Sequence, residues 1–201
     1  MSYAELAVTT NFSFLRGASH AEELVEQAAA LGLAVIGIAD RNTLAGVVRA
    51  HVAAKEKGLR ALTGARLVTV DGFETLCYPI DREAYGRLCR LLTRGNRRAK
   101  KGECHLELAD ILAESAGQIF IVLPPENLSQ IFRTSLMALV QAAPGRCYLG
   151  AAYLYGARAA RRLAELEELS RAAQAPLVAH NDVQYHAPER QMLADVLACI
   201  R

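Results

Sequence analysis

The feature that most constrains this chain is a regular alternation of short apolar runs with longer amphipathic stretches. Short runs rich in Val, Ile and Leu predict strands, and apolar residues three or four apart predict helices. Strands are expected at residues 5–10, 33–39, 60–68, 74–78, 118–123, 146–152 and 176–180. Helices are expected at residues 20–31, 43–57, 82–93, 106–114, 128–142 and 157–173. Repeated strand–helix units predict an α/β fold with parallel strands covered by helices, which right-handed crossovers can close into a barrel.

The clearest boundary signals surround the first expected helix. Ser19 is the expected N-cap, Glu22 completes a capping box, and Gly32 follows the helix end. Beyond the last strand, residues 188–201 form a tail that is apolar on one side near its end. No linker rich in Pro, Gly or Ser interrupts the pattern, so residues 1–201 are expected to form a single domain.

Composition excludes disordered and membrane-spanning chains. Apolar residues make up 52% of the 201 residues and charged residues 22%, as in ordinary globular domains. The longest apolar runs, such as residues 119–123, are far shorter than the roughly 18–20 residues of a spanning helix. No signal peptide is visible, and five cysteines without a CxxC pair predict reduced thiols in a cytoplasmic protein.

Several common catalytic motifs are missing from the sequence. There is no phosphate-binding Gly-x-x-x-x-Gly-Lys loop, no Gly-x-Gly-x-x-Gly after a strand and no Gly-x-Ser-x-Gly elbow. Cys104 and His105 are adjacent but have no third residue to orient them as a nucleophilic pair. The acidic pattern of a polymerase palm cannot be placed in this chain either.

In a fold of this kind, functional side chains gather where strands end. The first strand runs into residues 7–19, the second into residues 39–46 and the last into residues 179–185. In their order and in their residues, these segments resemble the PHP domain (polymerase and histidinol phosphatase) at the N-terminus of bacterial C-family replicative polymerases. The stretches most similar to the error-prone, DnaE-type members are residues 11–19, 85–93, 101–110 and 181–201.

The resemblance covers nearly the whole chain and implies a distorted (β/α)7 barrel of PHP type. It implies that residues 1–201 are the N-terminal part of a longer DNA polymerase, a nucleotidyltransferase that uses Mg2+. The longer chain is expected to act in replication, repair and tolerance of DNA damage. Expected partners are the other polymerase domains, DNA through those domains, and other translesion-synthesis proteins, with no membrane.

In active PHP domains, a His-x-His motif at a strand end supplies the first ligands of a site for up to three metal ions. Here Ala7 and Thr9 occupy the two histidine positions, and neither side chain replaces an imidazole ligand. Arg16 stands where the family has the Asp of a Leu-Asp-Gly segment. In the Asp-His pair the acid is kept as Asp40, and Arg41 replaces the histidine.

The remaining ligand positions are altered in the same way. Arg66 stands at the carboxylate of a Gly-x-Glu element, and the terminal Asp-x-His becomes Asp182 and Gln184. Three arginines would repel a divalent cation, and they can instead form ion pairs with Asp40 and Asp182. We therefore expect a metal-free scaffold without hydrolytic activity and without a cofactor of its own.

The alternative is a residual phosphoesterase or proofreading-type nuclease that binds one Zn2+ or Mn2+. His180 and Asp182 are two apart near a strand end and would share a face. Together with Asp40, and with His186 or Glu5 as further candidates, they would supply the ligands.

One stretch of the chain is strongly basic. Between residues 87 and 101 there are seven cationic residues and no acidic one, whereas the rest of the chain has 16 basic and 21 acidic residues. The seven are Arg87, Arg90, Arg94, Arg97, Arg98, Lys100 and Lys101. Such a basic loop can bind the phosphate backbone of DNA, dock on an acidic face of a neighbouring domain, or simply be solvated.

Overall fold

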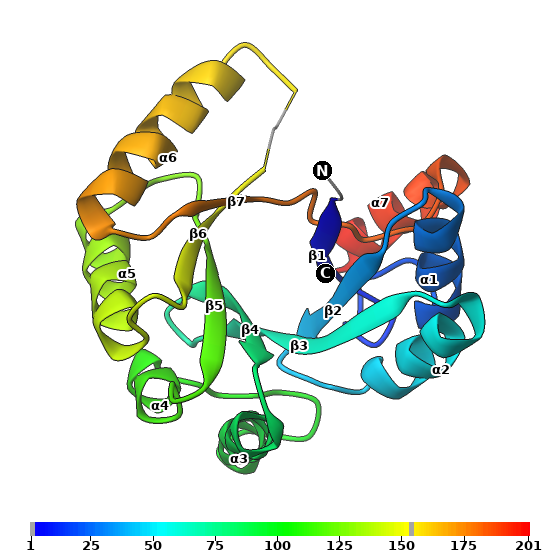
Figure 1. Cartoon of the computed structure of the whole chain (residues 1–201), viewed down its shortest axis with the longest axis horizontal. Coiled ribbons are helices and arrows are strands. Elements are labelled where there is room, and N and C mark those ends of the chain that lie inside the picture. The colour runs from blue at the N-terminus through cyan, green and yellow to red at the C-terminus, as the bar shows by residue number, and fades with distance from the viewer. Residues whose placement is uncertain (1–2, 153–154) are drawn as a thin grey trace. The chain divides into compact units, whose positions relative to one another are not determined.

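The computed structural model describes residues 3–152 and 155–201, which form two compact units (Figure 1). The first unit runs up to Arg66 and resumes at Asn181, and the second runs from Leu67 to His180. The alternation of strands and helices expected from the sequence is confirmed through both units.

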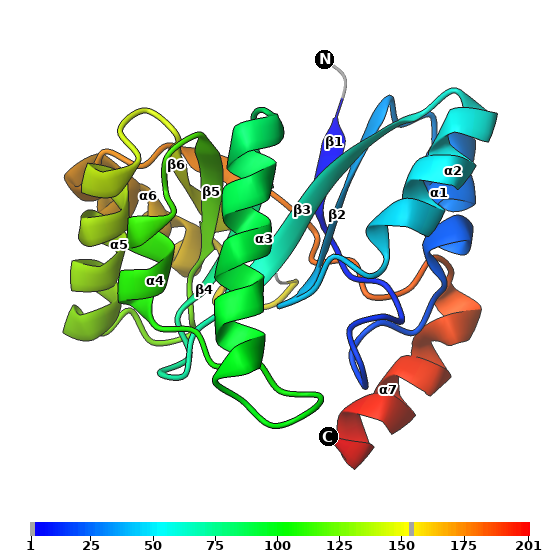
Figure 2. The ribbon, with the colours of Figure 1, turned by 90° about the horizontal axis from the view of Figure 1, so that it is seen from below.

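The first unit is built on parallel strands. They are β1 (Ala4–Val8), β2 (Val35–Arg41) and β3 (Arg60–Val68), with β2 and β3 in continuous register from Val35↔Arg60 to Arg41↔Arg66. Two helices, α1 (Ala21–Ala30) and α2 (Val47–Lys57), lie side by side along this sheet (Figure 2). The core between helices and strands consists of buried aliphatic side chains at Val8, Leu24, Val25, Ala28, Ile36, Ile38, Ala50, Ala53 and Ala54.

Two helix starts differ from the expectation in their capping residue or by more than two residues. The N-cap of α1 is His20 and not Ser19, because the Ser19 hydroxyl is engaged with His186 Nδ1 at 2.8 Å. The capping carboxylate is accordingly Glu23, which accepts a hydrogen bond from the His20 amide. The second helix begins four residues later than expected, after Gly46, because the preceding residues fold against Asp40.

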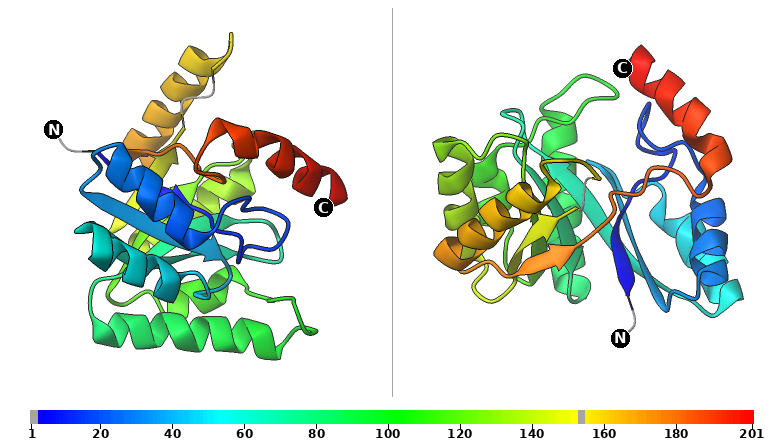
Figure 3. Two further views of the ribbon diagram at one scale, coloured as in Figure 1. Left: turned by 90° about the vertical axis from the view of Figure 1, so that its right-hand side faces the viewer. Right: turned by 90° about the horizontal axis from the view of Figure 1, so that it is seen from above.

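The last residues form a helix and not the expected tail. After a short 3-10 turn, η1 (Pro188–Arg190), helix α7 (Gln191–Ile200) lies beside the loop that follows β1 (Figure 3). Residues of that loop and of α7 line a hollow of about 230 Å3. No residue of α7 is buried, although the helix is apolar. Within residues 3–152 and 155–201, no helix has the length and apolarity that crossing a bilayer demands.

The second unit contains β4 (Glu74–Pro79), β5 (Gln118–Leu123), β6 (Cys147–Ala151) and β7 (Leu177–Ala179). The last three strands are parallel, but β4 is antiparallel to β5, so the expectation of parallel strands is wrong there. The reason is a tight turn over residues 69–73, which is closed by a hydrogen bond of 3.0 Å from the Thr69 amide to the Phe73 carbonyl. A turn this short reverses the chain, whereas a parallel strand needs a long crossover.

Four helices pack on these strands. They are α3 (Arg82–Arg97), α4 (Leu108–Ala113), α5 (Gln130–Ala142) and α6 (Ala159–Ala173). The core of this unit contains large buried side chains from these helices and from β5 and β6, at Leu88, Leu91, Ile111, Phe120, Leu136, Leu139, Leu149 and Leu166. Helix α3 runs four residues beyond its expected end, so most of the basic stretch is helical and not a loop. Its last turn packs closely, because a Cβ at Gly95 would lie 2.5 Å from Cys104 Sγ.

Candidate functional site

The eight positions of the expected degenerate metal site all lie in the first unit. Ala7 and Thr9 are at the end of β1, Asp40 and Arg41 close β2, and Arg66 lies opposite Arg41 on β3. Asp182 and Gln184 follow on the strand-like segment that runs parallel to β1, and Arg16 is in the loop after β1. The strand ends therefore bring these residues to one edge of the sheet in the first unit.

Asp40 is completely buried and bonded to neutral groups. Its Oδ1 accepts hydrogen bonds from the Thr10 amide at 2.8 Å and the Ser13 hydroxyl at 2.7 Å, and its Oδ2 accepts from the Thr10 hydroxyl at 2.8 Å. Burial raises the pKa of Asp40, and the hydrogen bonds from Ser13, Thr10 and Gly46 oppose that shift. Both carboxylate oxygens are thus used to hold the adjoining loops.

The loops close tightly around this carboxylate. A Cβ at Gly46 would lie 2.3 Å from Asp40 Oδ2, and a Cβ at Gly17 would lie 2.0 Å from the Thr10 carbonyl oxygen. The Ser13 hydroxyl also accepts a hydrogen bond from the Arg41 amide at 2.9 Å. Asp40 therefore acts as the anchor of the loop after β1, and glycine is required at the two points of closest approach.

The second remaining acid, Asp182, is bound by an arginine. Nη2 of Arg66 donates to Asp182 Oδ1, and the arginine side chain is 9% exposed. Asp182 adopts a left-handed backbone conformation with φ 52°. A guanidinium is a fixed cation with directed donors, so Arg66 supplies at this carboxylate the positive charge that a metal ion would bring.

Backbone bonds hold the segment after Asp182 against β1. The Val183 amide donates to the Ala7 carbonyl at 2.8 Å, and the Thr9 amide donates to the Val183 carbonyl at 2.9 Å. The Gln184 carbonyl accepts from the Ala18 amide at 2.7 Å. Ala7 and Thr9 are therefore joined through Val183 in a parallel ladder, and Gln184 is joined to the loop after β1.

The further ligand candidates have protein partners of their own. Glu5 is buried and accepts hydrogen bonds from the Asn181 amide at 3.0 Å and the Tyr3 hydroxyl at 2.7 Å. Burial raises the pKa of Tyr3, and the bond to Glu5 adds to the shift. His186 is bonded to Ser19, and His180 belongs to the second unit, where its amide donates to the Ala151 carbonyl.

Within residues 3–152 and 155–201, no three His, Cys, Asp or Glu side chains are grouped so that they would share a metal ion. Cys104 and His105 lie in the second unit, where His105 Nε2 is 3.4 Å from Glu103. Sequence reasoning missed the partners of Asp40, which are Thr10 and Ser13 and not arginines. The available signal was the pair of hydroxyl residues three apart directly after the first strand.

The basic residues belong to the second unit and lie along α3 and its end. Arg87, Arg90, Arg94 and Arg97 are on the helix, Arg98 is its C-cap, and Lys100 and Lys101 follow. Carboxylates of α4 and its C-cap, Asp110 and Glu114, form ion pairs with three of the arginines. The basic stretch is thus a helical surface partly paired with acids.

Comparison with known proteins identifies the relatives of this chain. The family model for the PHP domain matches residues 5–170. An error-prone DNA polymerase from Caulobacter vibrioides is 57% identical over 200 residues, which are 99% of this chain and 18% of that relative. An error-prone DNA polymerase from Rhodopseudomonas palustris is 50% identical over 206 residues, 100% of this chain and 19% of the relative. The chain spans less than a fifth of the length of these curated relatives.

Two solved structures share the fold at low sequence identity. A protein from Bifidobacterium adolescentis, provisionally described as a metal-dependent phosphoesterase, has a TM-score of 0.67 at 18% identity and covers 92% of this chain and 88% of its own. An amidohydrolase from Chromobacterium violaceum has the same TM-score and coverage at 14% identity. The expected α/β fold of PHP type is confirmed by these likenesses.

Proposed function

This chain belongs to the PHP-domain family, and from that premise we propose that it is a metal-free scaffold domain of a longer error-prone DNA polymerase. In this proposal the domain itself performs no hydrolysis. The longer chain carries out template-directed DNA synthesis during tolerance of DNA damage, with Mg2+ at a polymerase site outside these residues. The names of the relatives support the identity of the longer chain.

The observation that carries the proposal is that both carboxylate oxygens of Asp40 already accept hydrogen bonds from the protein. A metal ligand offers free lone pairs, but three side-chain and main-chain donors occupy both oxygens of this carboxylate. Hydrogen bonds to a charged group contribute about 1.5–3 kcal/mol each, so an ion would have to replace several of them. Ala7 at a histidine position offers no lone pair at all.

The charge at the second acid supports the same conclusion. Arg66 is bound to Asp182, and Arg41 lies opposite Arg66 on the neighbouring strand. A divalent cation placed at Asp182 would meet the fixed positive charge of Arg66. The donor set therefore fits a divalent metal poorly.

Exposed apolar side chains support the scaffold part of the proposal. Phe14 is 83% exposed in the loop after β1, and on α7 Met192 is 78% and Ile200 64% exposed. Exposed apolar surface of this kind marks interaction sites in soluble proteins. In the proposal, other domains of the polymerase cover these side chains.

Elemental analysis tests the metal-free state, on protein purified without chelator. We expect less than stoichiometric Zn2+ and Mn2+, and no hydrolysis of a model phosphodiester when either ion is added. A stoichiometric ion together with turnover that Asp182→Asn abolishes would overturn the proposal in favour of a residual phosphoesterase. Asp195→Asn, an exposed position on α7, is the matched control for that variant.

A further inference from the structure

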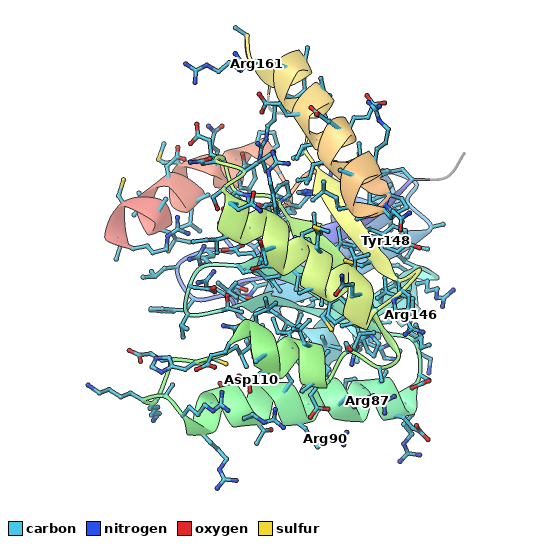
Figure 4. All side chains as sticks on the ribbon, turned by 90° about the vertical axis from the view of Figure 1, so that its left-hand side faces the viewer. Arg87, Arg90, Asp110, Arg146, Tyr148 and Arg161 are labelled. Carbon is cyan, nitrogen blue, oxygen red and sulfur yellow. The ribbon has the colours of Figure 1, made fainter. Side chains whose placement is uncertain are left out.

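A cationic surface runs along the exposed side of α3 in the second unit. We define the α3 basic face as Arg87, Arg90, Arg94, Arg97, Arg98, Lys100 and Lys101. Successive positions three or four apart share one side of a helix, so the residues at 87, 90, 94 and 97 or 98 form a stripe. Figure 4 shows Arg87 and Arg90 on α3, with Asp110 on the neighbouring α4.

Part of this charge is neutralised along one edge of the stripe. Arg94 contacts Asp110 at 3.4 Å and Glu114 at 3.2 Å, Arg98 contacts Asp110 at 2.6 Å, and Arg90 is 3.6 Å from Glu114. The two carboxylates are nearly buried, whereas the three arginine side chains are 40–63% exposed. The acids therefore fix the arginines in place and leave guanidinium groups accessible to solvent.

Burial acts to raise the pKa of Asp110. The Glu107 amide and the two guanidinium groups outweigh that effect and lower the pKa below its ordinary value. The carboxylate that holds Arg94 and Arg98 is therefore ionised at neutral pH, and the arrangement of the arginines is stable there.

Of the other four cations of the face, three are exposed and uncompensated. Within residues 3–152 and 155–201, no carboxylate forms an ion pair with Arg97, Lys100 or Lys101. Arg87 is 3.9 Å from Glu83 and donates to the Ala116 carbonyl at 2.7 Å. Four of the seven cations thus contact three carboxylates, which leaves an excess of four positive charges along α3 and the residues that follow it.

The surface formed by this stripe also contains a shallow hollow. Six residues of α3 and its C-cap line a surface hollow of about 590 Å3, and none of them is acidic or aromatic: Cys89, Arg90, Thr93, Arg94, Arg97 and Arg98. Proteins that bind single strands stack bases on aromatic side chains, so this lining does not suit unpaired bases. A lining of guanidinium and hydroxyl groups suits phosphate oxygens.

We propose that the α3 basic face binds the phosphate backbone of duplex DNA without reading its sequence. The choice of DNA as the polyanion rests on the proposed function, whereas the anion-binding chemistry rests on the surface alone. From residue 87 to residue 98 the helix rises about 16 Å. Over that length one strand of duplex DNA presents about five phosphates, which is comparable with the excess charge of the face.

The excess charge sets the expected dependence on salt. Contact with about four phosphates gives a slope of about −3.6 in the logarithm of the binding constant against the logarithm of salt concentration. Raising NaCl from about 50 to about 200 mM should then weaken binding about 150-fold. A surface that is merely solvated has no such slope.

The test is fluorescence anisotropy of this 201-residue chain with a labelled duplex of about 20 base pairs over that salt range, in EDTA. The triple variant Arg97→Gln, Lys100→Gln, Lys101→Gln removes three charges that hold no ion pair. We expect its slope to fall to about −0.9. The matched control neutralises three exposed arginines of α6 and its N-cap, Arg158→Gln, Arg161→Gln and Arg171→Gln, and should bind as the unaltered chain does.

Three results would overturn the proposal. The triple variant binds as well as the unaltered chain, or duplexes of unrelated sequence differ by more than tenfold in affinity, or polyglutamate binds more tightly than DNA at equal salt. The last result would assign the face to an acidic protein partner. Because EDTA removes divalent ions, DNA binding is independent of the metal and phosphodiester assays, so the failure of one proposal is distinguishable from the failure of the other.

Discussion

Replacement of Ser13 by alanine tests the account of Asp40 as a loop anchor. The Ser13 hydroxyl donates to the buried Asp40 carboxylate at 2.7 Å and accepts from the Arg41 amide at 2.9 Å. The variant loses a hydrogen bond to a charged group, worth about 1.5–3 kcal/mol, and leaves the Arg41 amide without this acceptor. We expect the free energy of unfolding to fall by about 2–4 kcal/mol, since the site excludes water that would compensate.

Urea unfolding followed by circular dichroism measures this change, and Tm should fall by about 2–4 °C for each kcal/mol. Ser170→Ala on α6 is the matched control and should change stability by no more than about 0.5 kcal/mol. A double-mutant cycle isolates the part of this contact that depends on charge, because Asp40→Asn keeps an acceptor oxygen and removes only the charge that strengthens the bond.

If Ser13→Ala costs as much in the Asp40→Asn background as in the unaltered chain, the negative charge of Asp40 adds nothing to this bond. The account of Asp40 as a charged anchor would then be refuted. A cost below about 1 kcal/mol in the unaltered chain would refute it as well.

Three further predictions concern close packing and ionisation. Gly46→Ala should destabilise the protein by more than about 2 kcal/mol in thermal unfolding, because its Cβ would lie 2.3 Å from Asp40 Oδ2. The control Gly86→Ala on α3 would place its Cβ 3.7 Å from Arg90 Nη1, so it should stabilise the protein by about 0.5–1 kcal/mol. Burial raises the pKa of Asp40 above its ordinary 3.8, so the stability that this group contributes is full below pH 3.8 and is lost as the pH rises through the raised value. In urea titrations, the unaltered chain should therefore lose stability relative to Asp40→Asn over that pH range. A difference between the two proteins that stays constant with pH would contradict the shift. Burial raises the pKa of the Cys147 thiol to about 12, so in the native protein a thiol reagent should label exposed Cys199 well before Cys147. Equal labelling rates for the two cysteines would contradict the packing of β6.

The sequence by itself determined where the strands and most helices lie. Apolar periodicity and helix-ending glycines are local signals, so β3 at Arg60–Val68 and the end of α2 before Gly58 agree with expectation. The order of motifs likewise supports the resemblance that places Ala7 and Thr9 at histidine positions, since that comparison needs no tertiary contacts. The direction of β4 could have been predicted as well, because only residues 69–73 separate two expected strands and a connection this short reverses the chain. The expectation of parallel strands overlooked that signal.

Only the tertiary structure decided what the remaining acids do. Thr10 and Ser13 meet Asp40 across about thirty residues, and Arg66 meets Asp182 across 116 residues. A local pattern does not say which residues meet across such distances. The charge of the arginines made them the expected partners of both acids, which holds for Asp182 and not for Asp40. In a fully buried site, several short neutral donors satisfy a carboxylate without the desolvation cost of a second charge, and that is the arrangement this fold adopts at Asp40.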